Sequence, residues 1–309
     1  LDKNYYFLDN LSNSKVNDFI KKDLSKFSIF IISKSGETLE TLTNFNIVLN
    51  NFKKRKKNIS KNFIIISEKN SVLFNFAREN NILFYEHNAN LSGRYSVLSE
   101  VGLLMFNLDY KKIIQGINSV LKKDLKKNLI SNAANLLTLI TKSKIDTHVS
   151  LIYSHSLLSY GYWHQQLLAE SIGKNGKDFT PIISECPKDH HSIMQLYLDG
   201  KRNKFFTFFK IINNKKDLPI KDYFDQKFKK SSLNNIIDVQ FNATTNVFKK
   251  NLIPFRVILI DQKKPIQSFI SLLVYSMLET AILCKALNLN PFNQPAVEAI
   301  KKETYSLLS

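Results

Sequence analysis

A compact apolar run at residues 27–33 (FSIFIIS) most constrains what this chain can fold into. Runs rich in β-branched residues, without polar alternation, are typical of strands buried on both faces of a parallel sheet. Two more such runs follow, at 63–67 (FIIIS) and 82–86 (ILFYE), and helical patterns separate the three. This order predicts an α/β fold with helices on the faces of a parallel sheet. Ligands of such sheets bind at the carboxyl ends of the strands.

A polar loop joins the first predicted strand to the next helical pattern, with the sequence KSGETLET at 34–41. A strand, a short loop and a helix start together aim backbone N–H groups and hydroxyls at one point. A phosphate can bind there because a helix N-terminus is electropositive and rich in hydrogen-bond donors. Simple helix capping by Ser33 or Ser35 is the alternative, and the residues alone leave it open.

An arginine follows the third predicted strand, at the start of another helical pattern. Because Gly93 precedes Arg94, we expect the guanidinium to reach over the sheet edge. Arginine is suited to binding an oxyanion or a phosphate. An exposed loop arginine is the alternative.

A helix with an apolar face is predicted over 161–174 (GYWHQQLLAESIGK), with Gly173 just beyond its last turn. Glu170 falls in that last turn, on the same side as Trp163 and Leu167. The negative end of the helix dipole disfavours the anion there and so favours proton uptake. Such a carboxylate can act as a general base, although an ordinary exposed glutamate would look the same.

A second sheet is predicted from apolar runs at 147–153, 205–211 and 255–260. Between the first two lies the pair His190 and His191, which cannot both face one site from a helix. At most one is expected to act, and a solvated pair is the alternative. No third metal ligand stands at a recognisable spacing, so we expect no metal site.

Composition limits the remaining classes. The chain has 309 residues and a formal net charge of +18, with Lys dispersed along it. We expect no nucleic-acid partner, because neither aromatic interleaving nor a zinc pattern accompanies the charge. Two cysteines form no disulfide framework, which suits a cytoplasmic protein. Polar residues interrupt the apolar run at 266–287, so we expect a buried core helix and no membrane span.

Five separated stretches, in order, resemble one family. They are SKSGETLET at 33–41, GRYSVLSEVGLL at 93–104, QQLLAESIGK at 165–174, DHHSIMQLYLDG at 189–200 and NPFNQPAVEAIKK at 290–302. The chain resembles the glucose-6-phosphate isomerase (phosphoglucose isomerase) family, whose members contain two sugar-isomerase (SIS) domains. Other SIS proteins share the first loop, whereas ESxGK and PFxQPxVExxK are much more specific.

The resemblance implies a fold of two SIS-type domains, each a mostly parallel sheet with helices on both faces (a three-layer αβα arrangement), plus a C-terminal helix. The first domain is expected at 1–125 and the second at 126–289. A helical tail that packs on the active site is expected at 290–309. The family's phosphate-binding residues match Ser33, Lys34 (through its backbone), Ser35, Thr38 and Gln294.

The catalytic residues of the family also have counterparts here. Glu170 matches the base that moves a proton between C1 and C2, and Arg94 matches the arginine beside the enediolate. His191 matches the ring-opening histidine, and Lys301 the lysine near the ring oxygen. Relatives commonly have Gln where His190 stands. In the family the ring-opening histidine, matched here by His191, comes from the partner subunit. The resemblance therefore implies a homodimer, and it implies no cofactor and no metal.

Two departures stand out. A GIGGS-like segment, which lines the sugar site in the family, has no counterpart before Leu1, so we expect a chain lacking its N-terminal segment and an exposed sheet edge. Ser92 stands where the family usually has the first Gly of GGR.

The leading hypothesis is a cytoplasmic isomerase that interconverts glucose 6-phosphate and fructose 6-phosphate in glycolysis and gluconeogenesis, with a related activity on mannose 6-phosphate left open. The alternative is a non-catalytic or truncated SIS-domain protein that only binds a sugar phosphate. A nucleic-acid binder would rest on charge alone.

Overall fold

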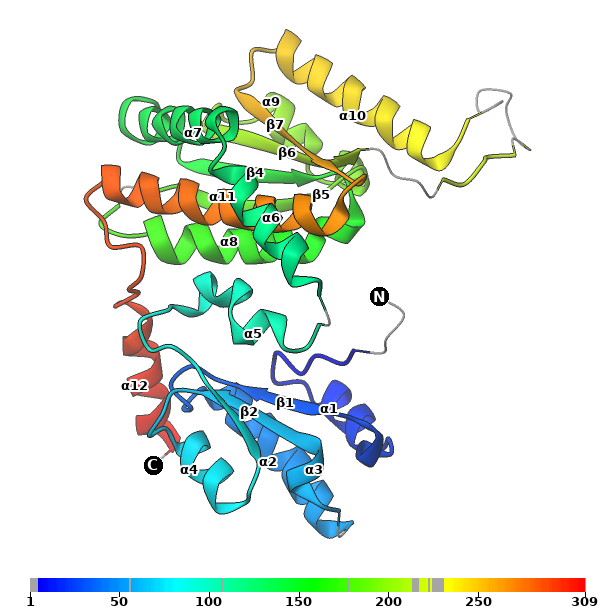
Figure 1. Cartoon of the computed structure of the whole chain (residues 1–309). Coiled ribbons are helices and arrows are strands. Elements are labelled where there is room, and N and C mark those ends of the chain that lie inside the picture. The colour runs from blue at the N-terminus through cyan, green and yellow to red at the C-terminus, as the bar shows by residue number, and fades with distance from the viewer. Residues whose placement is uncertain are drawn as a thin grey trace. The chain divides into compact units, whose positions relative to one another are not determined.

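The computed structural model describes residues 5–55, 57–106, 108–176, 178–212, 217–221, 223 and 231–308. The chain divides into two compact units, Leu1–Asn107 and Leu108–Ser309 (Figure 1). Residues 108–125, expected in the first domain, include helix α6 (Tyr110–Val120), which contacts helix α11 (Pro265–Ala286) of the second unit. The units are defined by contacts alone, and the proposed SIS-domain limits stay a prediction.

The first unit contains a three-stranded parallel sheet in the order β1-β2-β3. Its strands are β1 (Ile29–Ile32), β2 (Phe63–Ser67) and β3 (Leu83–Glu86). Its helices are α1 (Asn13–Ile20), α2 (Leu39–Lys54), α3 (Ile59–Asn62), α4 (Val72–Glu79) and α5 (Glu100–Leu103), with 3₁₀ turns at Leu24–Lys26 and Gly93–Leu98. The apolar runs of the sequence therefore form the expected parallel sheet.

Aromatic rings hold the helices of the first unit on its sheet. Phe45 and Phe52 of α2 contact the ring of Phe63 at centroid separations of 5.5 and 4.8 Å. All three side chains are buried with Ile65 of β2 and Leu73 of α4. Burial of a large apolar side chain contributes roughly 1.5–3 kcal/mol, so this cluster holds α2 and α4 against the sheet.

The second unit contains a four-stranded parallel sheet in the order β5-β4-β6-β7. Its strands are β4 (Thr147–Ile152), β5 (Thr180–Glu185), β6 (Lys204–Ile212) and β7 (Phe255–Asp261). Its helices, besides α6 and α11, are α7 (Lys123–Lys142), α8 (Leu158–Ile172), α9 (Met194–Asp199), α10 (Leu233–Lys250) and α12 (Val297–Leu308), with 3₁₀ turns at His155–Leu157 and Lys188–His191.

Alternate side chains of β6 face the two sides of this sheet. Phe206 and Phe208 join an apolar cluster with Phe241 and Phe248 of α10. Phe205 joins a separate cluster with residues of α7, α8 and α11. Because successive strand residues point to opposite faces, helices cover both faces of the sheet. The three-layer prediction is thereby confirmed for this unit.

Helix α11 is long and apolar enough, by composition, to cross a membrane. In the structure it instead contacts α6, α7, α8 and β7. Leu273, Leu283 and Cys284 are among its eight buried side chains. The prediction of a core helix is therefore confirmed.

A buried polar network crosses one face of the second sheet. Arg256 of β7 donates from Nη1 and Nη2 to the Glu279 carboxylate of α11 at 2.6 and 2.8 Å. Arg256 Nε donates to Thr207 Oγ1 at 3.0 Å. The Thr207 hydroxyl also lies 2.7 Å from His148 Nε2. Burial lowers the pKa of His148 well below its usual value, so the ring in this network is a neutral imidazole.

Two neutral buried histidines make the second unit sensitive to acid. Burial is the main cause that lowers the pKa of His148 well below its usual value and the pKa of His164 to about 3. A histidine in the unfolded chain titrates at about 6.5. The stability that the two neutral imidazoles contribute is therefore complete above that pH and is lost as the pH falls below it. Below that pH, each histidine lowers the free energy of unfolding by up to about 1.4 kcal/mol per pH unit.

Urea unfolding between pH 7.5 and 5.5 measures this effect. The midpoint of the second unit should fall with pH, and His164→Leu should make the fall shallower because one titrating group is removed. His155→Gln, at a histidine whose side chain is 83% exposed, is the control. A midpoint that does not change with pH would contradict the prediction.

Candidate active site

The polar loop of the first unit lies between the end of β1 and the start of α2, at the carboxyl edge of the sheet. Thr38 is the N-cap residue of α2, and its side chain makes no capping hydrogen bond. The Ser33 side chain is buried, and its Oγ lies 2.8 Å from Thr38 Oγ1 and accepts the Thr38 N–H at 3.3 Å. Ser35 Oγ accepts the Glu37 N–H at 3.3 Å. Neither serine is the N-cap, so the capping alternative is wrong, and both serines instead brace the loop.

Glycine is required within this loop. Gly36 has φ +73°, in the left-handed region that favours glycine. A Cβ atom there would lie 2.6 Å from Ser71 Cβ, well inside van der Waals contact. The turn at Gly36 is thus compatible only with glycine.

Lys34 is held by the end of the neighbouring strand. Its carbonyl oxygen accepts the Glu68 N–H at 2.9 Å and the Ser67 hydroxyl at 3.2 Å. Its ammonium lies 3.9 Å from the Glu68 carboxylate. With both the carbonyl and the side chain engaged by residues 67–68, the N–H is the group of Lys34 suited to a ligand, in keeping with a backbone role.

Arg94 lies inside the protein, with 1% of its surface exposed. It is the second residue of the 3₁₀ turn Gly93–Leu98, and its guanidinium carbon lies 5.8 Å from the Tyr95 ring centroid. The alternative of an exposed loop arginine is therefore wrong. A guanidinium keeps its charge inside a protein, where the low dielectric strengthens its attraction for an anion, so the position is a strong candidate for binding one.

Glu170 lies in the last turn of α8, as predicted. That helix ends at Ile172, and Gly173 caps it by donating its N–H to the Ala169 carbonyl at 3.0 Å. Gln166 donates from Nε2 to Glu170 Oε1 at 2.9 Å. The Glu170 side chain is half-buried, while Leu167 on the adjacent stripe is fully buried. The carboxylate is oriented by a neighbour and still accessible.

The end of α8 is tied to the proline-containing turn at 290–293. Lys174 donates from Nζ to the Asn290 carbonyl at 2.5 Å and to Asn293 Oδ1 at 3.0 Å. Ser171 donates to the Pro291 carbonyl at 3.3 Å. Sequence reasoning missed these contacts, although both partners lie in stretches that match the family. The turn that precedes Gln294 is thus fixed next to the helix end that carries Glu170.

The two adjacent histidines face in different directions. His190 Nε2 lies 2.8 Å from the Tyr153 hydroxyl and 3.3 Å from Thr244 Oγ1. Burial, followed by the neighbouring His191, lowers the pKa of His190. His191 is exposed. The two rings therefore differ in exposure, and His191 is the more accessible; that at most one of them acts stays a prediction.

The remaining candidates lie near the C-terminus. Gln294 is half-buried, and its carbonyl accepts the Val297 N–H at 3.4 Å. Lys301 lies in α12 and donates to Glu298 Oε1 at 2.8 Å. Helix α12 has no buried side chain. The predicted packing of this tail on an active site stays a prediction.

The candidate residues fall into two groups. Ser33, Lys34, Ser35, Thr38 and Arg94 belong to the first unit, and Glu170, His191, Gln294 and Lys301 to the second. Two cavities, of about 780 and 580 Å³, are lined by other residues. Across the described ranges, no three His, Cys, Asp or Glu side chains gather as a metal site would require.

Two parallel α/β units, one with a Ser/Gly/Thr loop that opens onto a helix N-terminus, have the sheet topology and the loop expected of a protein of the sugar-isomerase (SIS) class. A family model described as "Phosphoglucose isomerase" matches residues 2–250. The chain belongs to the phosphoglucose isomerase family.

Curated relatives carry consistent names. A probable glucose-6-phosphate isomerase of Methanococcus maripaludis is 35% identical over 312 residues, covering 98% of this chain and 71% of the relative. The glucose-6-phosphate isomerase of Methanocaldococcus jannaschii is 34% identical, covering 99% of this chain and 78% of the relative.

Solved structures share the fold. A hypothetical protein of Thermus thermophilus has a TM-score of 0.89 at 23% identity, covering 98% of this chain and 76% of that one. A glucose-6-phosphate isomerase of Chlamydia trachomatis has a TM-score of 0.84 at 18% identity, covering 98% of this chain and 63% of that one. At these identities the likeness concerns the fold alone.

Proposed function

We propose that this protein catalyses the reversible isomerisation of glucose 6-phosphate and fructose 6-phosphate. The observation that carries the proposal is the family membership, together with a relative named glucose-6-phosphate isomerase that aligns with almost the whole chain. The braced loop at the start of α2 supports a phosphate anchor, because its hydroxyls and backbone N–H groups gather at an electropositive helix end.

The proposed mechanism assigns one task to each group that binds the sugar or opens its ring. Ser33, Ser35, Thr38, Gln294 and the Lys34 N–H bind the phosphate. His191 moves the proton that opens the sugar ring, and Lys301 lies by the ring oxygen. The open-chain sugar is then ready for the proton transfer between its carbon atoms.

Glu170 removes the proton from C2 of the aldose and returns it to C1, while hydroxyl protons redistribute between O1 and O2. The product is the ketose, and no atom is gained or lost. Arg94 stabilises the negative charge of the enediolate that forms between the two proton transfers. The half-buried position of Glu170 and its contact with Gln166 are consistent with a base that must be both oriented and reachable.

We also propose a cytoplasmic homodimer that acts in glycolysis and gluconeogenesis, in which His191 serves the partner subunit's substrate. The exposure of His191, on a turn anchored by His190, supports this assignment.

A coupled assay tests the proposal. Fructose 6-phosphate is supplied, and glucose 6-phosphate is detected through NADP-dependent oxidation. The 309-residue chain and the product of the whole reading frame are both assayed. Turnover by either supports the isomerase, and mannose 6-phosphate is the second substrate. Tight binding of fructose 6-phosphate without turnover by either would favour the non-catalytic alternative.

A further inference from the structure

A buried histidine follows the third strand of the first unit and is not among the residues assigned above. His87 comes directly after β3 and is 3% exposed. Its backbone N–H donates to the Ser67 carbonyl at 2.8 Å, which ties it to the end of β2. The imidazole is therefore fixed at the sheet edge where the polar loops begin.

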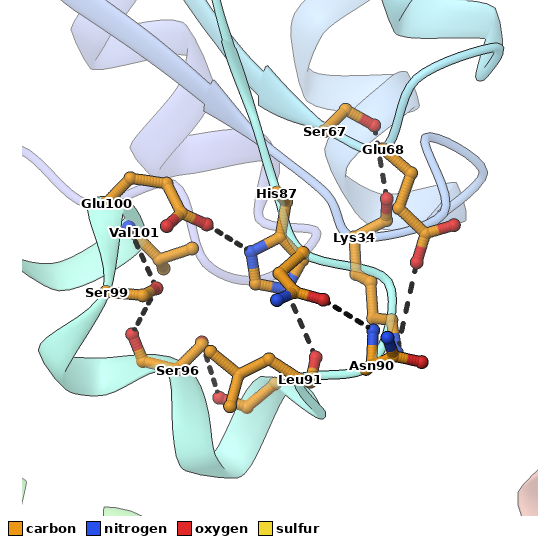
Figure 2. Close-up of polar contacts among 12 residues, drawn as sticks. Lys34, Ser67, Glu68, His87, Asn90, Leu91, Ser96, Ser99, Glu100 and Val101 are labelled. Atoms are coloured by element: carbon orange, nitrogen blue, oxygen red, sulfur yellow. Dashed lines mark hydrogen bonds and ion pairs between the residues drawn. The ribbon is translucent and has the colours of Figure 1, made fainter.

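Both nitrogens of the His87 ring have protein partners. Nε2 lies 3.2 Å from the Leu91 carbonyl oxygen, and Nδ1 is bonded to the Glu100 carboxylate (Figure 2). A carbonyl oxygen can only accept, so Nε2 carries a proton. A second proton lies between Nδ1 and Glu100, whichever of the two holds it. The ring thus has no nitrogen left for a substrate.

The two partners of this ring lie on either side of Arg94 in the sequence. Leu91 precedes Arg94 by three residues, and Glu100 is the first residue of α5. Between them the chain is held by local hydrogen bonds, such as Tyr95 N–H to the Ser92 carbonyl at 2.9 Å. The imidazole therefore closes the loop that carries Arg94 from both ends.

The same strand end also holds the loop assigned to phosphate binding. Ser67 accepts the His87 N–H through its carbonyl. Its hydroxyl donates to the Lys34 carbonyl at 3.2 Å (Figure 2). The end of β2 is thus a common support for Lys34 and for the loop of Arg94. A shift of the His87 ring is transmitted to the arginine more directly than to Lys34, because the hydrogen bonds of the ring go to Leu91 and Glu100, on either side of Arg94.

We propose that His87 and Glu100 are positioning residues for Arg94, which hold its guanidinium where charge develops on the enediolate. This inference rests on the proposed isomerase function. Removal of one partner of a buried ion pair leaves the other group buried without compensation. The loss of either His87 or Glu100 is therefore expected to disturb the loop that carries Arg94. Misplacement of a catalytic group by about 1 Å can cost about 100-fold in rate.

Glu100→Ala tests the proposal by steady-state kinetics with fructose 6-phosphate. We expect kcat to fall about 10- to 100-fold while KM changes less than about threefold, because Arg94 acts on the transition state. The affinity for 5-phosphoarabinonate, whose carboxylate imitates the enediolate, should fall in proportion to kcat/KM. Glu100→Gln keeps an amide N–H that can donate to Nδ1 of the neutral ring, whose Nε2 carries the proton, and should recover most of the rate.

Glu86→Ala is the matched control. Glu86 lies immediately before His87, and its carboxylate pairs with Lys69 at 2.6 Å on the surface. Its removal should leave kcat unchanged. If Glu100→Ala does not fold, Glu100→Asp moves the carboxylate by one methylene and should still lower kcat about tenfold at unchanged KM.

The outcomes separate the two proposals. An inactive wild-type protein overturns the proposed function and this inference with it. An active wild type with Glu100 variants of normal kcat, or variants whose thermal midpoint falls while kcat holds, overturns the positioning role alone. A loss of kcat with intact binding of fructose 6-phosphate and weakened binding of 5-phosphoarabinonate supports it.

Discussion

Replacement of Glu170 by Gln is expected to lower kcat for fructose 6-phosphate by about 10²- to 10⁴-fold, the usual contribution of a general base. The amide keeps the size of the carboxyl group and can still accept the Gln166 hydrogen bond of 2.9 Å, so the helix end should keep its structure. It cannot take up a proton from carbon. Binding of the sugar phosphate should change little, because the proposed phosphate ligands are elsewhere.

Steady-state kinetics and calorimetric titration with fructose 6-phosphate measure the two effects separately. Glu79→Gln is the control, since Glu79 also lies in the last turn of a helix, α4, and is exposed. Turnover of the Glu170 variant near the wild-type value would remove this residue from the mechanism and leave it a helix-end carboxylate.

Replacement of Glu279 by Ala is expected to destabilise the second unit by about 3–5 kcal/mol, because the Arg256 guanidinium is left buried without its carboxylate. Glu279 is 3% exposed and receives two N–H bonds from Arg256, of 2.6 and 2.8 Å. Replacement of both residues, as Arg256→Met with Glu279→Leu, should restore most of the stability, since an apolar pair of similar volume needs no compensating charge.

Denaturant unfolding monitored by circular dichroism measures these changes. Glu86→Ala is an informative comparison, because the Lys69–Glu86 pair has the same 2.6 Å separation but lies on the surface. An exposed pair contributes less than about 1 kcal/mol. A loss of similar size in Glu86→Ala and Glu279→Ala would show that burial is not the cause.

Several strands could be predicted from the sequence because their environment is uniform. The prediction of β2 at 63–67 is confirmed residue for residue, and its run FIIIS is buried along almost its whole length. Strand β5 was missed. Its sequence TPIISE contains a proline and three polar residues, and its side chains are mostly half-buried because it lies at the sheet edge. A hydrophobic periodicity or an apolar run can be recognised in a sequence only where successive side chains are buried in a consistent pattern.

Helix α10 was also missed. Its sequence is rich in Asn and Thr, and Phe241 and Phe248 are its only buried side chains, two turns apart. These rings pack on Phe206 and Phe208 of β6, so the stability of the helix comes from contacts that are distant in sequence. Local propensity carries little information about such a helix.

The residues of the candidate site could be named from their motifs, whereas most of their contacts could not be predicted. The loop at 34–41 and the helix end at Glu170 could be placed because each sits at a recognisable junction of elements. The burial of Arg94 and the inward orientation of the His190 ring could not be predicted from the sequence. The first accompanies a loop closed by His87 and Glu100, and the second depends on Tyr153 and Thr244, which lie 37 and 54 residues from His190.

The strand order β5-β4-β6-β7 has a consequence for how the second unit acquires its structure. Strand β4 is made first and pairs on both sides, with β5 at one edge and with β6 at the other. During synthesis, one edge of β4 therefore stays open until residue 212 has been made, and β7 can add only afterwards. Pairings of this separation form slowly, and an open apolar edge invites aggregation while they form. Hydrogen-exchange labelling during refolding should find β4 amides protected before those of β7, and the reverse order would place the nucleus elsewhere.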